Sequence, residues 1–209
     1  MTHSETGPDF EQMLHPEELR SVLLSVSLFV MIFEMFRDRV VDHPRFLHSN
    51  EFGPNGWVVD KAAYERDVTS RHKNTLQASL LWFHSYNAID DDDLKTFARI
   101  RSCRNRVVHE LSNLLGSAAI NEVGPRFQEL HKLFRKIEVW WFRNFEMEFN
   151  DALAGREFED DEITPGSFLM IQMLVDSALG EGDKAWRWYN AFAAARAEQP
   201  PLDESSREP

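Results

Sequence analysis

The sequence predicts an all-α protein, an up-and-down bundle of about four long helices followed by one or two shorter C-terminal helices. Apolar residues recur at helical spacing through four long stretches, whereas no stretch shows the strict alternation of a half-buried strand. Glycine and proline number only nine each in a chain of 209 residues. A chain of this length can bury one full hydrophobic core, so we expect the helices to share it.

The long helices are expected at residues 17–41, 60–86, 92–115 and 125–153. Asp42-His43-Pro44 should end the first helix, because proline disfavours helical backbone in the residue before it. A loop rich in Gly, Pro and Asn follows at 49–56. Four aspartates at 90–93 suit the N-cap and first turn of the third helix, where carboxylates meet free N–H groups. The fourth helix has a wide aromatic face, which core packing or a partner surface would explain.

Composition changes along the chain predict its organisation. Thr164 and Pro165 form a good N-cap and first helical position for a shorter helix at 166–179. A second short helix is expected at 183–197. These helices would pack on the bundle or form a dimer arm. We expect a disordered tail at 1–16, a helical bundle at 17–155, an acidic loop at 156–164, C-terminal helices at 165–197 and a second disordered tail at 198–209.

Charge and cysteine content narrow the class of function. A net charge of −12 argues against general coating of nucleic acid, because phosphate affinity comes mainly from Lys and Arg. It is compatible with a selective nuclease that has a small basic pocket. The one cysteine, Cys103, is expected to be a core thiol and fits a reducing cytoplasm. The apolar run at 22–33 is too short to span a bilayer, so membrane association is not expected. Met, Cys and His are never grouped at ligand spacing, so neither a metal nor another cofactor is expected.

Within the 92–115 helix, the segment Arg104-Asn105-Arg106-Val107-Val108-His109 combines a guanidinium, a carboxamide and an imidazole. The bare spacing from Arg to His recurs elsewhere, but only here does Asn follow the Arg, within the one dense basic cluster of the chain. A histidine can transfer protons, and an arginine can hold a phosphate and stabilise its developing charge. The segment therefore suits RNA cleavage without a metal.

The geometry of a regular helix constrains this pair of residues. Arg104 falls near the centre of the apolar stripe, so it must be paired, or face a cavity or a partner. His109 lies about 140° away from Arg104 around the helix. Either the helix is irregular at Arg104-Asn105, or a symmetric dimer brings two copies of the segment together.

The segment resembles the HEPN superfamily of helical proteins, whose ribonuclease members carry an Arg, a polar residue that is often Asn, and then a His. The resemblance covers about 17–153 in helix order, but only 104–109 in specific residues. It implies a HEPN-like bundle and a metal-independent endoribonuclease, with a composite active site at a homodimer interface and a 2′,3′-cyclic phosphate product.

The resemblance also implies roles for individual residues. His109 would be the general acid or base, Arg104 would hold the scissile phosphate, and Asn105 would orient it or bond the segment from the second protomer. Arg101 and Arg106 are candidates for binding neighbouring phosphates of the RNA.

HEPN nucleases commonly act as toxins or phage-defence effectors, restrained by an antitoxin or other regulatory protein. One subgroup has a modified Tyr two residues after the His, where this chain has Leu111. An alternative is that Arg104 is a structural arginine bonded to Glu34 or Glu110 and that His109 is an ordinary surface histidine. The chain would then be a non-catalytic dimerisation or adaptor module. A ligand-sensing bundle is a third interpretation.

Overall fold

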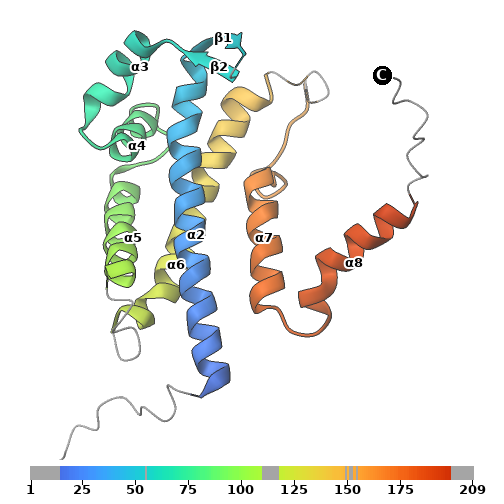
Figure 1. Cartoon of the computed structure of the whole chain (residues 1–209). Helices are drawn as coiled ribbons and strands as arrows, with labels where there is room; N and C mark the ends of the chain where they lie inside the picture. Colours follow the sequence, from blue (N-terminus) through green and yellow to red (C-terminus); the bar gives the residue numbers. More distant parts are fainter. Residues whose placement is uncertain are drawn as a thin grey trace, which may run out of the picture.

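The computed structural model describes residues 15–54, 56–109, 118–148, 150, 153 and 155–198. This part of the chain is mostly helical, as predicted for an all-α protein, and includes one small two-stranded hairpin. In Figure 1, α2 runs through the middle of the molecule, with α4 and α5 on one side and α7 and α8 on the other. The tails expected at 1–16 and 198–209 lie almost wholly outside the described residues.

Helix α2 (Pro16–Leu47) continues past its predicted end at residue 41. His43 and Pro44, which were expected to end it, are buried inside it. Two side chains complete its last turn: His48 Nδ1 donates to the carbonyl oxygen of Pro44 over 2.6 Å, and Ser49 Oγ donates to that of Arg45 over 3.0 Å. The predicted end is therefore wrong, because burial and this capping outweigh the local preference of the residues before proline.

The apolar part of α2 is also longer than the run at 22–33. Among the described helices α2 alone is long and apolar enough to cross a membrane, with a mean hydropathy of 1.9 over 18 residues. The buried helix of a water-soluble core passes the same test, and a third of this window is buried. Phe29, Ile32, Phe33 and Phe36 of α2 are at most 5% exposed and form the centre of the core.

The loop expected at 49–56 is instead mostly a β-hairpin, so that prediction is wrong. Strands β1 (Ser49–Gly53) and β2 (Gly56–Val59) pair antiparallel, with Phe52 opposite Trp57. The two rings meet edge to face, with centroids 5.4 Å apart. Gly56 adopts φ 102°, which only glycine adopts readily, and this allows the tight connection. This cross-strand aromatic pair stabilises the hairpin, although its short strands lack the apolar–polar alternation by which longer strands are recognised.

The helix expected at 60–86 is broken into three pieces, so its prediction as one helix is wrong. They are α3 (Lys61–Asp67), a 3₁₀ turn η1 (Thr69–Arg71) and α4 (Thr75–Ser85). Asp60 Oδ1 caps α3 by accepting hydrogen bonds from the amides of Ala62 and Ala63. Asn74 Oδ1 caps α4 by accepting from the Gln77 amide over 3.0 Å. The second cap starts a new helix within the predicted one.

Helices α5 (Asp91–His109) and α6 (Ala118–Trp141) complete the bundle, and α6 continues into a π-helical turn, η3 (Phe142–Glu146). Phe36 of α2 joins them, with its ring centroid 5.8 Å from that of Phe97 in α5 and 5.5 Å from that of Phe134 in α6. Burial of each such side chain stabilises the fold by roughly 1.5–3 kcal/mol. The predicted span 125–153 is wrong at both ends, because Pro125 lies inside α6 and the continuous helix ends at Glu146. The part of the third predicted helix beyond His109 lies outside the described residues.

The two C-terminal helices have nearly the predicted bounds. They are α7 (Gly166–Leu179) and α8 (Asp183–Glu198). Pro165 is at the N-cap position of α7, one residue before its predicted place. Helix α7 packs on α2, whereas α8 packs mainly on α7 and points away from the bundle (Figure 1).

Candidate functional site

Acidic capping fixes the start of α5, as the four aspartates predicted. Asp90 Oδ1 accepts hydrogen bonds from the amides of Asp92 and Asp93 over 2.9 and 3.0 Å, while Asp93 Oδ2 accepts from the Asp90 amide. The Asp93 amide and the ammonium of Lys136 on α6 lower the pKa of Asp90 to about 2. The start of α5 is therefore tied both to its own backbone and to α6.

The backbone of α5 is regular helix throughout Asp91–His109, so an irregularity at Arg104-Asn105 is excluded as the way to bring Arg104 and His109 together. Phe97, Ile100, Cys103 and Val107 form its buried face. Cys103 is fully buried, and burial raises the pKa of its thiol. This placement confirms the prediction that Cys103 is a core thiol.

Arg104 was predicted near the centre of the apolar stripe, and that prediction is wrong: Arg104 lies at the edge of the buried face, where α5 meets α2. Its Nη2 donates to Glu34 Oε1, and its guanidinium carbon lies 5.4 Å from the centroid of the Phe33 ring. Its Nη1 donates to Asn105 Oδ1 over 3.3 Å. Glu34 is shared, because Arg37 also pairs with it. The pair between Glu34 and Arg104 was one of the two alternatives left open by the sequence, and both side chains are only about a quarter exposed (27% and 26%).

The outer face of α5 brings together three of the predicted site residues. Arg101, Asn105 and His109 are all exposed. At 3.6 residues per turn, Asn105 lies about 40° around the helix from each of the other two. Nowhere in the described ranges does a carboxylate pair with Arg101 or His109, and the guanidinium carbon of Arg101 lies 6.0 Å from the centroid of the Phe97 ring. This outer face thus carries a cation, an amide and an imidazole, with Arg104 linked to it through Asn105.

Arg106 is not part of this face. It lies on the edge of α5 that meets α6, and its Nη2 donates to Glu122 Oε2 over 2.5 Å. Both side chains are about 40% exposed. Of the two residues proposed for neighbouring phosphates, Arg101 is therefore open towards the outer face, whereas Arg106 already has an anionic partner on α6.

A second polar cluster, which the sequence analysis missed, centres on Glu138 of α6. Glu138 is 2% exposed and binds three side chains. Arg39 Nη2 donates to Oε2 over 3.1 Å, His43 Nε2 lies 2.5 Å from Oε1, and Ser167 Oγ donates to Oε2 over 2.6 Å. His43 also stacks on Trp141, with ring centroids 3.9 Å apart. We call these four residues, Arg39, His43, Glu138 and Ser167, the Glu138 cluster.

The Glu138 cluster joins helices and has no arrangement for nucleophilic catalysis. Burial alone would raise the pKa of Glu138, but the hydrogen bond and charge of His43, with Ser167 and Arg39, lower it to about 2. Burial lowers the pKa of His43, whose neutral ring can still donate Nε2–H to Glu138. Ser167 donates to the carboxylate and not to the imidazole, so the serine lacks an adjacent base. The only sign of this cluster in the sequence was the single carboxylate of Glu138 within an aromatic stretch of α6.

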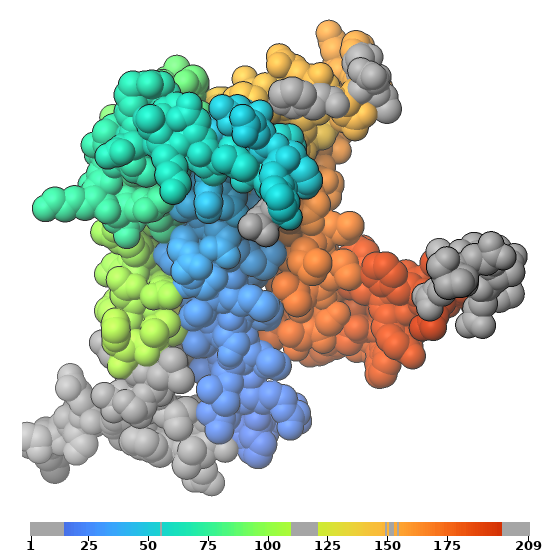
Figure 2. Space-filling view, turned by 45° about the horizontal axis from the view of Figure 1, so that its top comes forward, coloured from blue at the N-terminus to red at the C-terminus, as the bar shows by residue number. Residues whose placement is uncertain are grey.

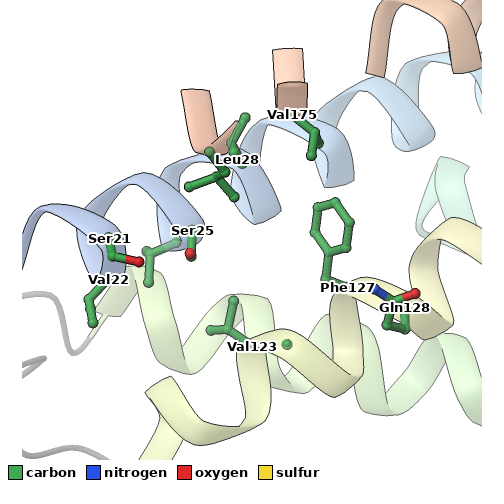
Figure 3. A pocket seen from close by; sticks show the side chains of 11 residues that line it. Ser21, Val22, Ser25, Leu28, Val123, Phe127, Gln128 and Val175 are labelled. Atoms are coloured by element: carbon green, nitrogen blue, oxygen red, sulfur yellow. The ribbon is translucent and has the colours of Figure 1, made fainter. Parts of the chain in front are cut away.

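A cavity of about 380 Å³ lies where α2, α6 and α7 meet (Figure 3). Val22, Leu28, Val123, Phe127 and Val175 form apolar walls, and the polar atoms come from Ser21, Ser25 and Gln128. No charged side chain lines it, so it does not suit a phosphate group. In the described segments, no group of three or more His, Cys, Asp or Glu side chains is placed to hold a metal ion.

The chemistry available on the outer face of α5 is therefore proton transfer by His109 and anion binding by arginine, both without a metal. Comparisons of the chain with protein-family models, with curated proteins and with solved structures gave no significant match.

Proposed function

We propose that this protein is a metal-independent endoribonuclease of HEPN type, active as a homodimer in the cytoplasm. The observation that carries this proposal is the outer face of α5, which presents Arg101, Asn105 and His109 together, with no carboxylate among the described residues paired to Arg101 or His109. Arg104 borders this face through its hydrogen bond to Asn105. A small basic face on a chain of net charge −12 suits a selective nuclease, such as a toxin or phage-defence effector restrained by a protein partner.

Two copies of the face are needed for one active site. Because α5 is regular, one chain separates Arg104 from His109 by about 140°. A two-fold axis over this face can place His109 of one protomer beside Arg104 of the other. Ala98 and Ser102 lie on the same exposed face, and their small side chains allow two α5 helices to approach closely. The proposed site is thus composite, with one residue from each chain.

The chemistry follows from these groups. His109 would take the proton of the ribose 2′-hydroxyl or protonate the leaving oxygen. Arg104 would stabilise the charge that develops on the scissile phosphate. Glu34 does not prevent this role, since it keeps Arg37 as a partner when the guanidinium of Arg104 turns to a phosphate. Attack by the 2′-oxygen leaves a 2′,3′-cyclic phosphate, and no metal-bound water is required.

The first test compares growth and total RNA after induced expression of the wild type, Arg104→Ala and His109→Ala. We expect growth arrest with discrete RNA fragments for the wild type and neither effect for the two variants at equal protein level. His15→Ala and Arg99→Ala are matched controls, because they remove an exposed histidine and an exposed arginine away from the outer face. Cleavage by purified protein should persist in EDTA. The proposal would be contradicted if RNA stayed intact although the wild-type protein was expressed, or if all variants cleaved RNA equally.

A complementation test addresses the composite site. When Arg104→Ala and His109→Ala chains are mixed, a heterodimer carries one site with both residues intact and one with neither. Random mixing makes about half of the dimers heterodimers, so we expect about a quarter of wild-type cleavage from two inactive proteins. A site contained in one chain would give no recovery. That result would reject the composite arrangement even if both single variants were inactive.

The ion pair between Arg104 and Glu34 favours a second candidate, a non-catalytic HEPN-like dimerisation or adaptor module that binds a protein partner. In that case Arg104 holds α5 against α2, and His109 is a surface residue. This candidate predicts that the wild type and both variants are equally harmless, and that dimerisation and partner binding survive His109→Ala.

A further inference from the structure

Helix α8 extends away from the rest of the protein. Figure 2 shows it projecting from the body beyond α7, which is its main packing partner. Every residue from Tyr189 to Ala197 is exposed. A helix of this length is only marginally stable in water without tertiary contacts. This exposure calls for a partner that covers α8.

The direction of α8 is fixed at its base. The carboxylate of Asp176 on α7 is fully buried and accepts hydrogen bonds from Gln172 Nε2 over 2.7 Å and from Trp188 Nε1 on α8 over 3.1 Å. In the connection, a side chain at Gly180 would lie 2.1 Å from the carbonyl oxygen of Asp176, and Gly182 adopts φ +52°. These contacts at the base of α8 therefore fix the direction in which the helix projects.

An aromatic stripe runs along the exposed side of α8. Trp186, Tyr189 and Phe192 are 59%, 67% and 62% exposed, and the spacing of three residues places them on one side of the helix. Arg196 continues the same stripe. Water-soluble proteins rarely leave three neighbouring aromatic side chains uncovered, and aromatic residues are enriched in the cores of protein interfaces.

The same chain offers an apolar groove between α2 and α7. A hollow of about 500 Å³ is lined by Leu24, Ser27, Met31, Met170 and Met173, among others, and by no charged side chain. It continues along α2 into a second hollow, which includes Leu19 and Leu23. Along α2 the distance from Leu19 to Met31 is about 18 Å, and α8 is about 24 Å long, so the helix and the groove have similar lengths. Flexible methionines can adapt to large aromatic side chains.

We propose that α8 docks in the α2–α7 groove of a second copy of this chain, by reciprocal exchange of two arms. Both the protruding stripe and the apolar groove lie on one protomer, which is what an isologous interface requires. The charges are complementary: α8 carries a net charge of +1 in a chain of −12. Pro16, Leu19 and Arg20 line the end of the groove, and Glu17 and Glu18 of the same first turn of α2 are acidic residues that Arg196 could reach there. The whole surface of an aromatic side chain is about 200 Å². Because the three aromatic side chains of each arm are about 60% exposed, covering both arms would bury roughly 1,400 Å² of arm and groove surface together, which is the size of a stable dimer interface.

This interface does not compete with the α5 face. Helices α5 and α8 lie on opposite sides of α2 in Figures 1 and 2. Two isologous interfaces on one chain build a closed tetramer when their two-fold axes are perpendicular and meet. Loss of the arm interface is expected to halve the mass in solution. A dimer held by the arms alone would become a monomer, and a tetramer would become a dimer. RNA cleavage by the mixed Arg104→Ala and His109→Ala proteins depends on α5 alone, so the two proposals can fail separately.

The test measures mass in solution by light scattering for the wild type and for Trp186→Ser/Phe192→Ser. We expect about half the wild-type mass at the same protein concentration. The matched control is Ala191→Ser/Ala194→Ser, on the opposite side of α8, which weakens helix propensity at least as much and should keep the wild-type mass. Equal masses for the wild type and the aromatic variant would overturn the proposal.

A cross-link then locates the interface. Cys103 is buried, so new cysteines can report on the surface. Ser27→Cys in the groove with Ala193→Cys on α8 should form, on oxidation, a species at twice the chain mass of 24.4 kDa. A disulfide confined to single chains would overturn the exchange between copies. Pelleting of wild type, but not of the aromatic variant, with phosphatidylcholine–phosphatidylglycerol vesicles from a monomeric solution would identify a lipid surface as the occupant instead.

Discussion

Two carboxylates, Glu34 and Glu138, each join α2 to a neighbouring helix. One ion pair is accessible to a ligand, whereas the other is buried and stabilises the fold. Glu34 pairs with Arg104 of α5 at the surface, where both side chains are about a quarter exposed. Glu138 of α6 pairs with Arg39 of α2 in the interior, where the Glu138 side chain is 1% exposed. A ligand phosphate can compete with Glu34 for a guanidinium, but no solute reaches Glu138.

The two sites also differ in the number of partners for each charge. Glu34 has two arginines, so one can leave without stranding the carboxylate. Glu138 accepts hydrogen bonds from Arg39, His43 and Ser167, and its removal leaves those three donors without their acceptor. The cost of breaking a buried ion pair comes mainly from the group that is left behind.

The largest effect is expected for Glu138→Ala, because it strands the buried His43 and part of Arg39. We expect a loss of about 3–5 kcal/mol in the free energy of unfolding, measured by urea denaturation. Glu146→Ala is the matched control, since Glu146 lies 3.9 Å from Arg39 and is half exposed, and its loss should cost less than about 1 kcal/mol. Equal effects of the two substitutions would show that the Glu138 cluster is no more important than a surface pair.

Acid should weaken the Glu138 cluster in two steps. The pKa of His43 lies below its ordinary value of 6.5, so the unfolded chain binds a proton that the folded chain does not, and stability begins to fall just below that pH. The pKa of Glu138 is about 2 and ordinarily 4.5, so a further loss of about 3 kcal/mol follows as the pH falls from 4.5 towards 2.

The upper step can be assigned to His43 by substitution. His43→Gln should flatten the decline in urea midpoint between about pH 7 and about pH 5. The pKa of His131 is also lowered by burial, so His131→Gln is the control that removes a separate share of the slope. An unchanged slope in His43→Gln would mean that His43 does not titrate with folding.

The sequence predicted features that depend on neighbouring residues better than it predicted the buried Glu138 cluster, for a physical reason. Capping by the aspartates at 90–93 and the extents of α7 and α8 depend on residues close in sequence, and Glu34 was already a candidate partner of Arg104. The Glu138 cluster joins residues 95 positions apart in the case of His43. Tertiary burial keeps His43 and Pro44 inside α2, where local preference favours a helix end. The turn at Asn74 and the hairpin were missed because their signals span only a few residues.

A smaller effect is expected for Arg104→Ala. The ion pair with Glu34 is partly exposed and Glu34 keeps Arg37, so we expect a loss of about 1 kcal/mol, which is about 2–4 °C in Tm for a chain of this size. Arg99→Ala, on the same helix with the Arg99 side chain 54% exposed, should change Tm by less. A loss as large as that of Glu138→Ala would make Arg104 a structural residue and favour the adaptor function.

The smallest effect on stability is expected for His109→Ala, and this is what makes His109 the sharpest probe of function. His109 is exposed on the outer face of α5, so its loss should change the free energy of unfolding by no more than about 0.5 kcal/mol. The endoribonuclease predicts complete loss of RNA cleavage from this nearly neutral change, whereas the Glu138 variant should lose stability first and cleavage only as a consequence. Thermal unfolding and cleavage of one RNA substrate, measured on the same preparations, compare the two. Retained cleavage by a stable His109→Ala protein would leave the outer face of α5 without a catalytic role.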